Sequence, residues 1–199
     1  MSEYLIKSEN TAISNGNSRS AELLKRDSTL NDICLDYGCG KLRNAAFLKP
    51  YVTRIDLFDS KVQLDKQIEK IKEYGDVYYL EDYNLPIDTY DKILCSFVIN
   101  VIQGYDERKA AVVSIIKALK IGGLAYIEVR NKTFISDLKV YEEDIVNGGY
   151  IIGAGKTRTY QFPFNMDELV DFIISIDNNI KIIEKVKTSG SVICVFQKI

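Results

Sequence analysis

The most informative absence in this chain of 199 residues is histidine, which does not occur at all. Without histidine, His-containing metal sites and every Ser-His or Cys-His nucleophile pair are excluded. Cysteine is scarce as well, and the four thiols, at Cys34, Cys39, Cys95 and Cys194, follow none of the spacings of metal fingers. Three of them fall in or beside predicted strands, which favours buried free thiols. We therefore predict no metal site.

Neither sign of charge is in large excess, because the chain has 26 lysines and arginines and 28 aspartates and glutamates, which gives a net charge of −2. The chain therefore has no overall positive charge that would bind nucleic acid non-specifically. Binding of nucleic acid would need a local patch of basic residues. Long apolar runs are missing too: no segment reaches membrane-spanning length, and the first residues, Met-Ser-Glu-Tyr, begin no signal segment. We expect a cytoplasmic protein of one domain, without a membrane partner.

What the chain does contain is a short apolar stretch, Ile33 to Leu35, followed by two glycines, Gly38 and Gly40. Continuous apolar residues are typical of a strand buried on both faces, as in a parallel sheet. Glycines after such a strand let a ligand approach the main chain, and a following helix directs free N–H groups at that ligand. A Gly-x-Gly turn also closes many ligand-free α/β loops, so this spacing alone is weak evidence.

The residues around the turn narrow the alternatives. Asp36 stands just before the turn, and Asp59 lies 21 positions after Gly38, which fits the interval of about 20 residues to a ribose-binding carboxylate. The third glycine of a dinucleotide fingerprint would fall at Arg43, so the Gly-x-Gly-x-x-Gly pattern is broken. The broken pattern disfavours a nicotinamide-dependent oxidoreductase.

Two stretches carry a resemblance to a known family. Leu35-Asp36-Tyr37-Gly38-Cys39-Gly40 resembles the first motif of the class I S-adenosylmethionine-dependent methyltransferases. Leu119-Lys120-Ile121-Gly122-Gly123 is similar to the family's Leu-Lys-Pro-Gly-Gly segment, with Ile121 in place of proline, and lies at the expected distance from the first motif. The chain departs from the family at Leu42, where a third glycine is common, which predicts a bulkier start of the next helix. The similarity extends over nearly the whole chain.

This resemblance implies an α/β fold, namely a Rossmann-like three-layer α/β/α sandwich. Its sheet would be mostly parallel and seven-stranded, with a C-terminal antiparallel hairpin. Together with the apolar periodicity, it predicts strands over residues 33–35, 52–58, 77–80, 92–96, 124–129, 180–187 and 192–198, and helices over about 42–48, 60–74, 107–120 and from a cap at Asn165 onward. We expect an N-terminal arm over residues 1–20, a methyltransferase domain over 21–199, and a substrate-site insertion over 130–165 within it.

The resemblance further implies S-adenosyl-L-methionine as the cofactor and assigns residues to its parts. For the methionine end, Gly38 and Gly40 would allow close approach, Asp36 would accept from the amino group, and Arg43 would pair with the carboxylate. For the nucleoside, Asp59 would hold the ribose with Asp56 as the reserve, Asp82 and Tyr83 would contact the adenine, and Ser96 would touch the cofactor.

No catalytic base is assigned. Glu128, Tyr105 and Tyr160 are candidates by position only, and a neutral amine or a soft acceptor needs no base. The segment after the fourth predicted strand, Phe97 to Ile102, contains neither the Asn-Pro-Pro-Tyr motif of amino-methylating DNA enzymes nor the Pro-Cys nucleophile of cytosine-5 enzymes, which disfavours both. Asn100 and Tyr105 lie where the family places residues that face the acceptor.

The insertion leaves the acceptor open. Lys156, Arg158 and Tyr160 alternate, so as a strand they would share one face, which either grips an anionic acceptor or is a solvated edge protected by its charges. Short patches at residues 11–14, 97–102 and 157–169 are similar to methyltransferases linked to DNA phosphorothioation, but no substrate is carried over from them. The alternative function is a non-catalytic subunit that binds S-adenosylmethionine for regulation or for a partner.

Overall fold

The computed structural model describes residues 16–82, 84–136, 140–153 and 158–199. The α-helices are α1 (Arg19–Asp27), α2 (Arg43–Leu48), α3 (Lys61–Asp65), α4 (Ile68–Ile71), α5 (Tyr105–Ala118), α6 (Lys132–Ser136) and α7 (Met166–Ile174), and the short 3-10 helices are η2 (Lys49–Tyr51), η3 (Leu80–Asp82) and η4 (Ile99–Val101). The strands are β1 (Ile33–Tyr37), β2 (Arg54–Asp59), β3 (Val77–Tyr79), β4 (Tyr90–Ser96), β5 (Leu119–Arg130), β6 (Val140–Asp144), β7 (Gly149–Ile152), β8 (Thr159–Gln161), β9 (Ile180–Lys187) and β10 (Ser191–Lys198).

Seven strands form one sheet in the order β3-β2-β1-β4-β5-β10-β9. The first five run parallel, whereas β10 is antiparallel to both of its neighbours, β5 and β9. The predicted fold class, including the C-terminal antiparallel hairpin, is therefore confirmed. Because the strand order reverses between β1 and β4, the carboxyl ends of these strands form the switch point at which open α/β sheets bind ligands.

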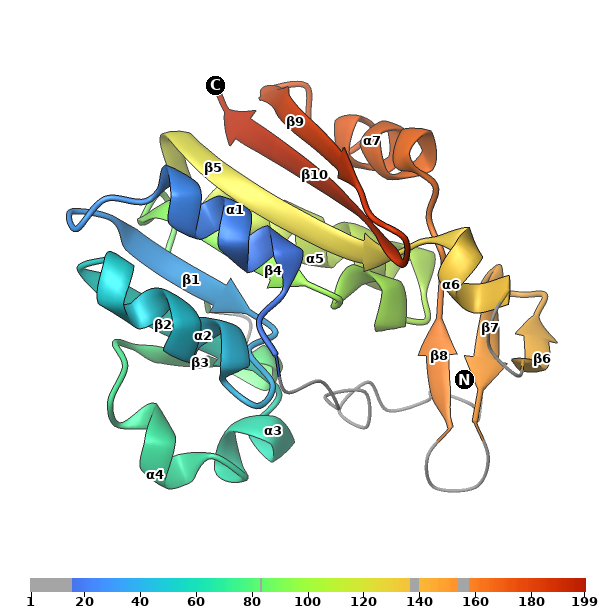
Figure 1. The fold of residues 1–199 in the computed structure, drawn as a ribbon, viewed down its shortest axis with the longest axis horizontal. Coiled ribbons are helices and arrows are strands. Elements are labelled where there is room, and N and C mark those ends of the chain that lie inside the picture. The colour runs from blue at the N-terminus through green and yellow to red at the C-terminus, as the bar shows by residue number, and fades with distance from the viewer. Residues whose placement is uncertain (1–15, 83, 137–139, 154–157) are drawn as a thin grey trace.

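Helices cover both faces of the sheet and enclose two hydrophobic cores (Figure 1). On one face α1 and α2 supply Leu24 and Leu48, and on the other α5 and α7 supply Ile115 and Leu169. The adjacent β1 residues 34 and 35 belong to opposite cores, as the continuous apolar run predicts for a strand buried on both faces. All four cysteines are buried and free, which confirms the buried free thiols predicted for the cysteines in or beside strands.

The helix predicted over residues 60–74 is divided into the two short helices α3 and α4. The apolar periodicity of this stretch predicts that Val62, Leu64, Ile68 and Ile71 face the core. Leu64 and Ile71 are buried, but Val62 and Ile68 are each 47% exposed, so the prediction is wrong for these two residues. Since helices in proteins are stabilised mainly by packing of one apolar face, two anchoring residues do not hold a single continuous helix here.

The glycine pair Gly122-Gly123 closely follows the helix predicted over about 107–120, which predicts that the pair ends this helix. The structure shows that this prediction is wrong. α5 already ends at Ala118, and both glycines lie inside β5, where the pairing with β4 shifts register. A Cβ atom on Gly123 would lie 2.9 Å from the carbonyl oxygen of Tyr90. Close approach of two strands, rather than a helix cap, therefore explains this glycine.

The insertion over residues 130–165 contains a second, three-stranded antiparallel sheet in the order β6-β7-β8. Its strand β8 lies against η4, because Phe162 N donates to Asn100 O at 2.7 Å and Asn100 Nδ2 donates to Gln161 Oε1 at 2.7 Å. Tyr160 is only 1% exposed, so it is not part of an exposed gripping face. Lys156, the first member of that predicted face, lies outside the described residues.

Within the described ranges, no helix combines the length and the apolar character needed to cross a membrane. The same part of the chain contains no group of three or more Cys, Asp or Glu side chains suited to a metal ion. The cellular compartment and the boundary of the N-terminal arm stay predictions.

Candidate functional site

The glycine turn lies at the carboxyl end of β1. Gly38 and Gly40 have φ angles of 78° and 50°, which only glycine adopts without strain. The amides of Gly38 and Cys39 both donate to Phe58 O at the end of β2, and a Cβ atom on Gly38 would collide with the Val98 side chain. The turn is therefore held between the ends of β2 and β4, with its main chain close to the switch point.

Leu42, where the family commonly has a third glycine, adopts a left-handed φ of 62°. A non-glycine residue in this conformation is strained by about 1–2 kcal/mol. Its side chain is 3% exposed and packs in the same core as α1 and α2. The additional bulk predicted at this position is therefore accommodated by the core.

Asp36, the acidic residue of the motif, is 1% exposed. Among the described residues, its Oδ2 atom has no hydrogen-bond partner. Burial raises the pKa of this carboxyl to about 7, against the opposing influence of the nearby Arg43 charge. Because a buried polar atom without a partner is costly, Oδ2 is a natural acceptor for a donor group on a ligand.

Asp59 ends β2 and lies beside the glycine turn. Its Oδ2 accepts from Gly40 N at 2.7 Å, and its Oδ1 accepts from Ser60 N at 2.7 Å. Burial is the main reason that the pKa of this carboxyl is raised. A carboxylate has further lone pairs beyond these two bonds, so Asp59 retains the capacity to accept from a ligand.

Asp56, the reserve candidate, is fully buried nearer the start of β2. Its carboxylate accepts from Asp76 N at 2.9 Å and from the Tyr90 hydroxyl at 3.0 Å, and Arg54 Nη2 donates to it at 3.1 Å. These contacts explain Asp56 as a structural residue that joins β2, β4 and the segment before β3.

The other residues predicted to contact the cofactor are Arg43, Asp82, Tyr83 and Ser96. Arg43 donates to Gly16 O, so its guanidinium has a partner within the chain. Asp82 is exposed at the end of η3, and Tyr83 lies outside the described residues. Ser96 is 8% exposed at the end of β4, and its Oγ atom, like Asp36 Oδ2, has no partner in the described part of the chain.

The three positional candidates for a base differ in their surroundings. Glu128 accepts from Ser20 N at 2.9 Å and from Ser191 Oγ at 2.7 Å, and so ties α1 to β5 and β10. Tyr160 lies with its hydroxyl between Arg108 Nη1, at 3.2 Å, and a carbonyl of the β6–β7 turn. Tyr105 is 54% exposed. Glu128 and Tyr160 therefore both have structural partners.

The sequence did not predict the contacts of Arg130 with two aromatic rings. The Arg130 guanidinium, at the carboxyl end of β5, lies 4.1 Å from the ring centroids of both Phe97 and Phe134. Phe97 follows β4 with a left-handed φ of 60°, which is uncommon for a bulky residue and occurs often at functional sites. Arg130 directly follows the strand predicted over residues 124–129. Open α/β sheets bind ligands at the carboxyl ends of their strands, so this position could have identified Arg130 as a candidate ligand contact.

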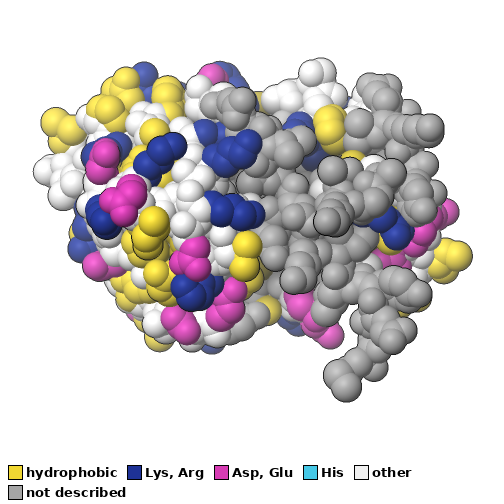
Figure 2. All heavy atoms as spheres, turned by 90° about the horizontal axis from the view of Figure 1, so that it is seen from below, with side chains coloured by type: hydrophobic (Ala, Val, Ile, Leu, Met, Phe, Trp, Pro, Cys, Tyr) yellow, Lys and Arg dark blue, Asp and Glu magenta, His cyan; other side chains and the backbone are white. Residues whose placement is uncertain are grey.

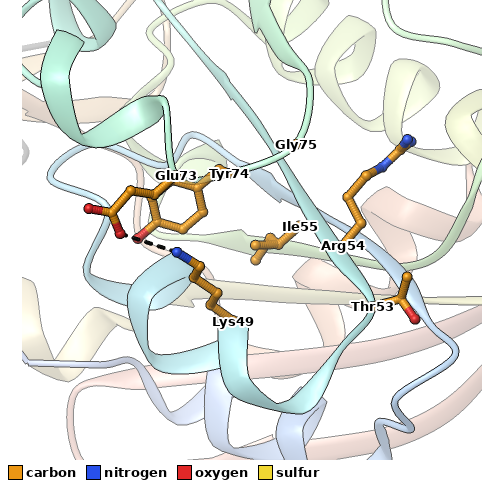
Figure 3. A pocket seen from close by; sticks show the side chains of 7 residues that line it. All are labelled: Lys49, Thr53, Arg54, Ile55, Glu73, Tyr74 and Gly75. Atoms are coloured by element: carbon orange, nitrogen blue, oxygen red, sulfur yellow. Dashed lines mark hydrogen bonds and ion pairs between the residues drawn. The ribbon is translucent and has the colours of Figure 1, made fainter.

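A cavity of about 320 Å³ lies at the opposite, amino end of β2 and is lined by Lys49, Thr53, Arg54, Ile55, Glu73, Tyr74 and Gly75 (Figure 3). Lys49 and Glu73 form an ion pair of 3.1 Å across its rim. It contains none of the motif residues, and the ligand crevice of this topology lies at the other end of the strands. We therefore do not take this cavity as the functional site.

On the described part of one face, Lys and Arg side chains lie among Asp and Glu side chains (Figure 2). This distribution agrees with the near-neutral net charge of −2. The distribution of charge does not test whether the protein binds nucleic acid.

Comparisons with known proteins agree with this geometry. A family model described as a methyltransferase domain matches residues 35–127. The chain is 32% identical over 175 residues to the uncharacterized protein YmfD of Escherichia coli K12. The aligned region covers 81% of this chain and 77% of YmfD.

Many solved structures share the fold, including two methyltransferases. An S-adenosylmethionine-dependent methyltransferase from Clostridium acetobutylicum aligns with a TM-score of 0.67 and 14% identity, over 97% of this chain and 92% of that one. The N-methyltransferase NodS from Bradyrhizobium japonicum, in complex with S-adenosylhomocysteine, aligns with a TM-score of 0.61 and 13% identity, over 90% and 85% of the two chains.

Proposed function

Because the chain belongs to the class I S-adenosylmethionine-dependent methyltransferase family, we propose that it transfers a methyl group from S-adenosyl-L-methionine to an acceptor at the carboxyl ends of β4 and β5. The observation that carries the proposal is the buried Asp36 oxygen without a partner, beside the glycine turn. Its position at the switch point suits a ligand that presents an ammonium group.

The residues present fit this cofactor. Asp36, the last residue but one of β1, and Ser96, the last residue of β4, lie near the carboxyl ends of neighbouring strands. Within the described residues, neither Asp36 Oδ2 nor Ser96 Oγ has a hydrogen-bond partner. Asp36 would accept from the amino group of the methionine moiety, and Asp59 would accept from the ribose hydroxyls while keeping its bond to Gly40 N. Asp56 is already engaged by three groups of the chain, which supports Asp59 for the ribose.

When bound, the cofactor supplies a methyl group that is already activated by the sulfonium. The contribution of this chain is therefore mainly position: holding the acceptor in line with the methyl group supplies about 7–11 kcal/mol by proximity and orientation. The structural partners of Glu128 and Tyr160 favour an acceptor that reacts as a neutral nucleophile without a protein base.

Calorimetric titration with S-adenosylhomocysteine tests the proposal. We expect one micromolar site per chain in the unaltered protein, and binding weakened by roughly 1–3 kcal/mol in Asp59→Ala, since charge-assisted hydrogen bonds are lost. Asp65→Ala is the matched control, because Asp65 is half-exposed and pairs only with Lys61 on the same helix turn among the contacts described. Absence of binding in folded protein would overturn the proposal.

Methyl transfer itself is tested with cofactor labelled in the methyl group. Incubation with a cell extract should give a labelled product whose formation requires the intact protein. Binding of S-adenosylhomocysteine without any labelled product, across protein, nucleic-acid and small-molecule fractions, would instead favour the non-catalytic subunit.

A further inference from the structure

The arrangement around Arg130 points to a property of the methyl acceptor. The guanidinium of Arg130 is half-buried and is placed between two aromatic rings, with its central carbon 4.1 Å from the centroid of Phe97 and 4.1 Å from that of Phe134. Cation–π contacts of this kind hold the orientation of the group. They do not neutralise its charge.

No carboxylate of the described residues forms a hydrogen bond or an ion pair with this guanidinium. The neighbouring carboxylate, Glu128, is two residues earlier on the same strand, and its two oxygens accept from Ser20 N and Ser191 Oγ instead. Glu128 acts on Arg130 only through its charge, and burial lowers the pKa of Arg130. A half-buried cation held in place without a direct counter-ion is a feature of anion-binding sites.

The two rings also restrict what Arg130 can bind. With both ring centroids 4.1 Å from its central carbon, the guanidinium already has two aromatic partners, so we expect a ligand to meet the N–H edge of its plane rather than to stack on it. That edge matches two oxygens of a carboxylate or a phosphate in a bidentate contact. Gly190 lies beside Arg130 Nη1, and a Cβ atom there would be 3.8 Å away, so no side chain of this hairpin residue covers the edge.

The position of Arg130 relates it to the acceptor side of the crevice. Ser96 of β4 is paired in register with Glu128 of β5, so Arg130 extends just beyond the end of β4. Phe97, which contacts Arg130, directly follows Ser96. Asn100, on the same segment after β4, is 1% exposed, and its Oδ1 atom has no partner among the described residues. A charged donor and a neutral acceptor therefore border the segment that follows β4.

We propose that Arg130 binds an anionic group, a carboxylate or a phosphate, on the methyl acceptor, so that the substrate is an anionic molecule. This inference rests on the proposed methyltransferase function and specifies the substrate class of the same site. The alternative source of a carboxylate is the methionine end of the cofactor, for which Arg43 is the candidate, with its central carbon 6.0 Å from the Phe97 ring centroid.

The first experiment uses benzoate and inorganic phosphate as probes, on protein saturated with S-adenosylhomocysteine. Ligand-observed NMR should show saturable benzoate binding that phosphate displaces. Arg130→Gln should weaken this binding about tenfold or more, and Arg130→Lys should weaken it less, since lysine keeps the charge but loses the bidentate fork. Arg26→Gln is the matched control, because Arg26 is a half-exposed arginine bonded to Asp27 and Glu184.

Each outcome of this experiment decides something. Equal probe binding by Arg130→Gln and the unaltered protein, or no probe binding by the unaltered complex, would overturn the inference. A tenfold loss of S-adenosylhomocysteine affinity in Arg130→Gln would assign the arginine to the cofactor carboxylate and overturn the acceptor assignment. No binding of S-adenosylhomocysteine by the unaltered protein is a separate result, which overturns the proposed function and with it this inference.

A second experiment tests the substrate class directly. The labelled product from the extract assay should be retained on an anion-exchange resin at neutral pH, and its rate of formation should fall about tenfold in Arg130→Gln with thermal stability and S-adenosylhomocysteine affinity retained. A labelled product without anionic groups, formed equally fast by Arg130→Gln, would overturn the inference while leaving the methyltransferase function intact.

Discussion

Two aspartates on neighbouring strands, Asp36 of β1 and Asp56 of β2, are both buried, yet they have opposite surroundings. Asp56 accepts from Asp76 N and the Tyr90 hydroxyl and is bonded by Arg54. Asp36 has an oxygen without a partner among the described residues. Burial raises the pKa of both carboxyls. Burial and a shifted pKa therefore do not by themselves distinguish a structural carboxylate from a binding one, whereas the unfilled hydrogen-bonding capacity does.

The largest expected effect is on the structural side of this comparison. Asp56→Ala should lower the free energy of unfolding by about 3–5 kcal/mol, because it leaves the buried Tyr90 hydroxyl and the Asp76 amide without their acceptor and the half-exposed Arg54 without its counter-ion. Urea denaturation measures this loss. Asp36→Asn, which removes a charge without a hydrogen-bonded counter-ion, should not destabilise the protein. If both variants lost the same free energy of unfolding, the distinction between a structural Asp56 and a binding Asp36 would be wrong.

Leu42 tests whether bulk next to the glycine turn belongs to the core. Leu42→Ala should lower the free energy of unfolding by about 2–5 kcal/mol, the usual range for a buried leucine. Leu42→Gly should cost less than Leu42→Ala, because glycine relieves the left-handed φ of 62°. Thermal denaturation compares the pair. Tighter S-adenosylhomocysteine binding by Leu42→Gly would show instead that the leucine side chain restricts the crevice.

On the binding side, Asp36→Asn should weaken S-adenosylhomocysteine binding by roughly 1–3 kcal/mol, since the amide replaces a charged acceptor with a neutral one. Calorimetric titration at pH 8 measures this change. The free variant should be at least as thermally stable as the unaltered protein at that pH. Unchanged affinity in Asp36→Asn would remove this residue from the site.

The ionisation of Asp36 should make both stability and affinity for S-adenosylhomocysteine depend on pH. Burial raises the pKa of Asp36 from 3.8 to about 7, so its stabilising contribution is complete below pH 3.8 and is lost as the pH rises through about 7. An ammonium group on the ligand favours the ionised carboxylate, so affinity for S-adenosylhomocysteine should increase between pH 6 and about 8. Titrations across this range, with Asp36→Asn as the control, measure the slope. A slope that persists in the variant would assign the titration to another group.

The smallest effect is expected in the cavity at the amino end of β2. Lys49→Gln removes the rim ion pair with Glu73, in which both side chains are well exposed. The free energy of unfolding should change by no more than about 1 kcal/mol, as is usual for an exposed pair. Binding of S-adenosylhomocysteine should stay the same. A clear loss of binding in this variant would move the functional site to that cavity.

The sequence was most informative where the physical cause is local. The apolar run before Gly38 predicted β1, and the interval to Asp59 placed an acid at the end of β2, because both depend on neighbouring residues and on short connections. The helix cap predicted at Asn165 is likewise confirmed, because α7 begins directly after this residue and both hydrogen bonds of a capping box between Asn165 and Glu168 are present. The division of the helix predicted over residues 60–74 and the place of Gly122-Gly123 inside β5 were predicted wrongly. The first depends on how few of its apolar residues pack in the core, and the second on the close approach of β4 to β5.

By itself, the sequence determined the α/β class, the glycine turn at the switch point and the family to which the chain belongs, because hydrophobic period and glycine geometry act over a few residues. Only the tertiary structure decided which aspartates are satisfied, where the Leu42 side chain packs and that Glu128 ties α1 to the sheet. It also decided that Arg130 lies between Phe97 and Phe134. The physical reason is that hydrogen-bond partners and ring contacts join residues from separate strands and helices, whose proximity exists only once the chain is folded.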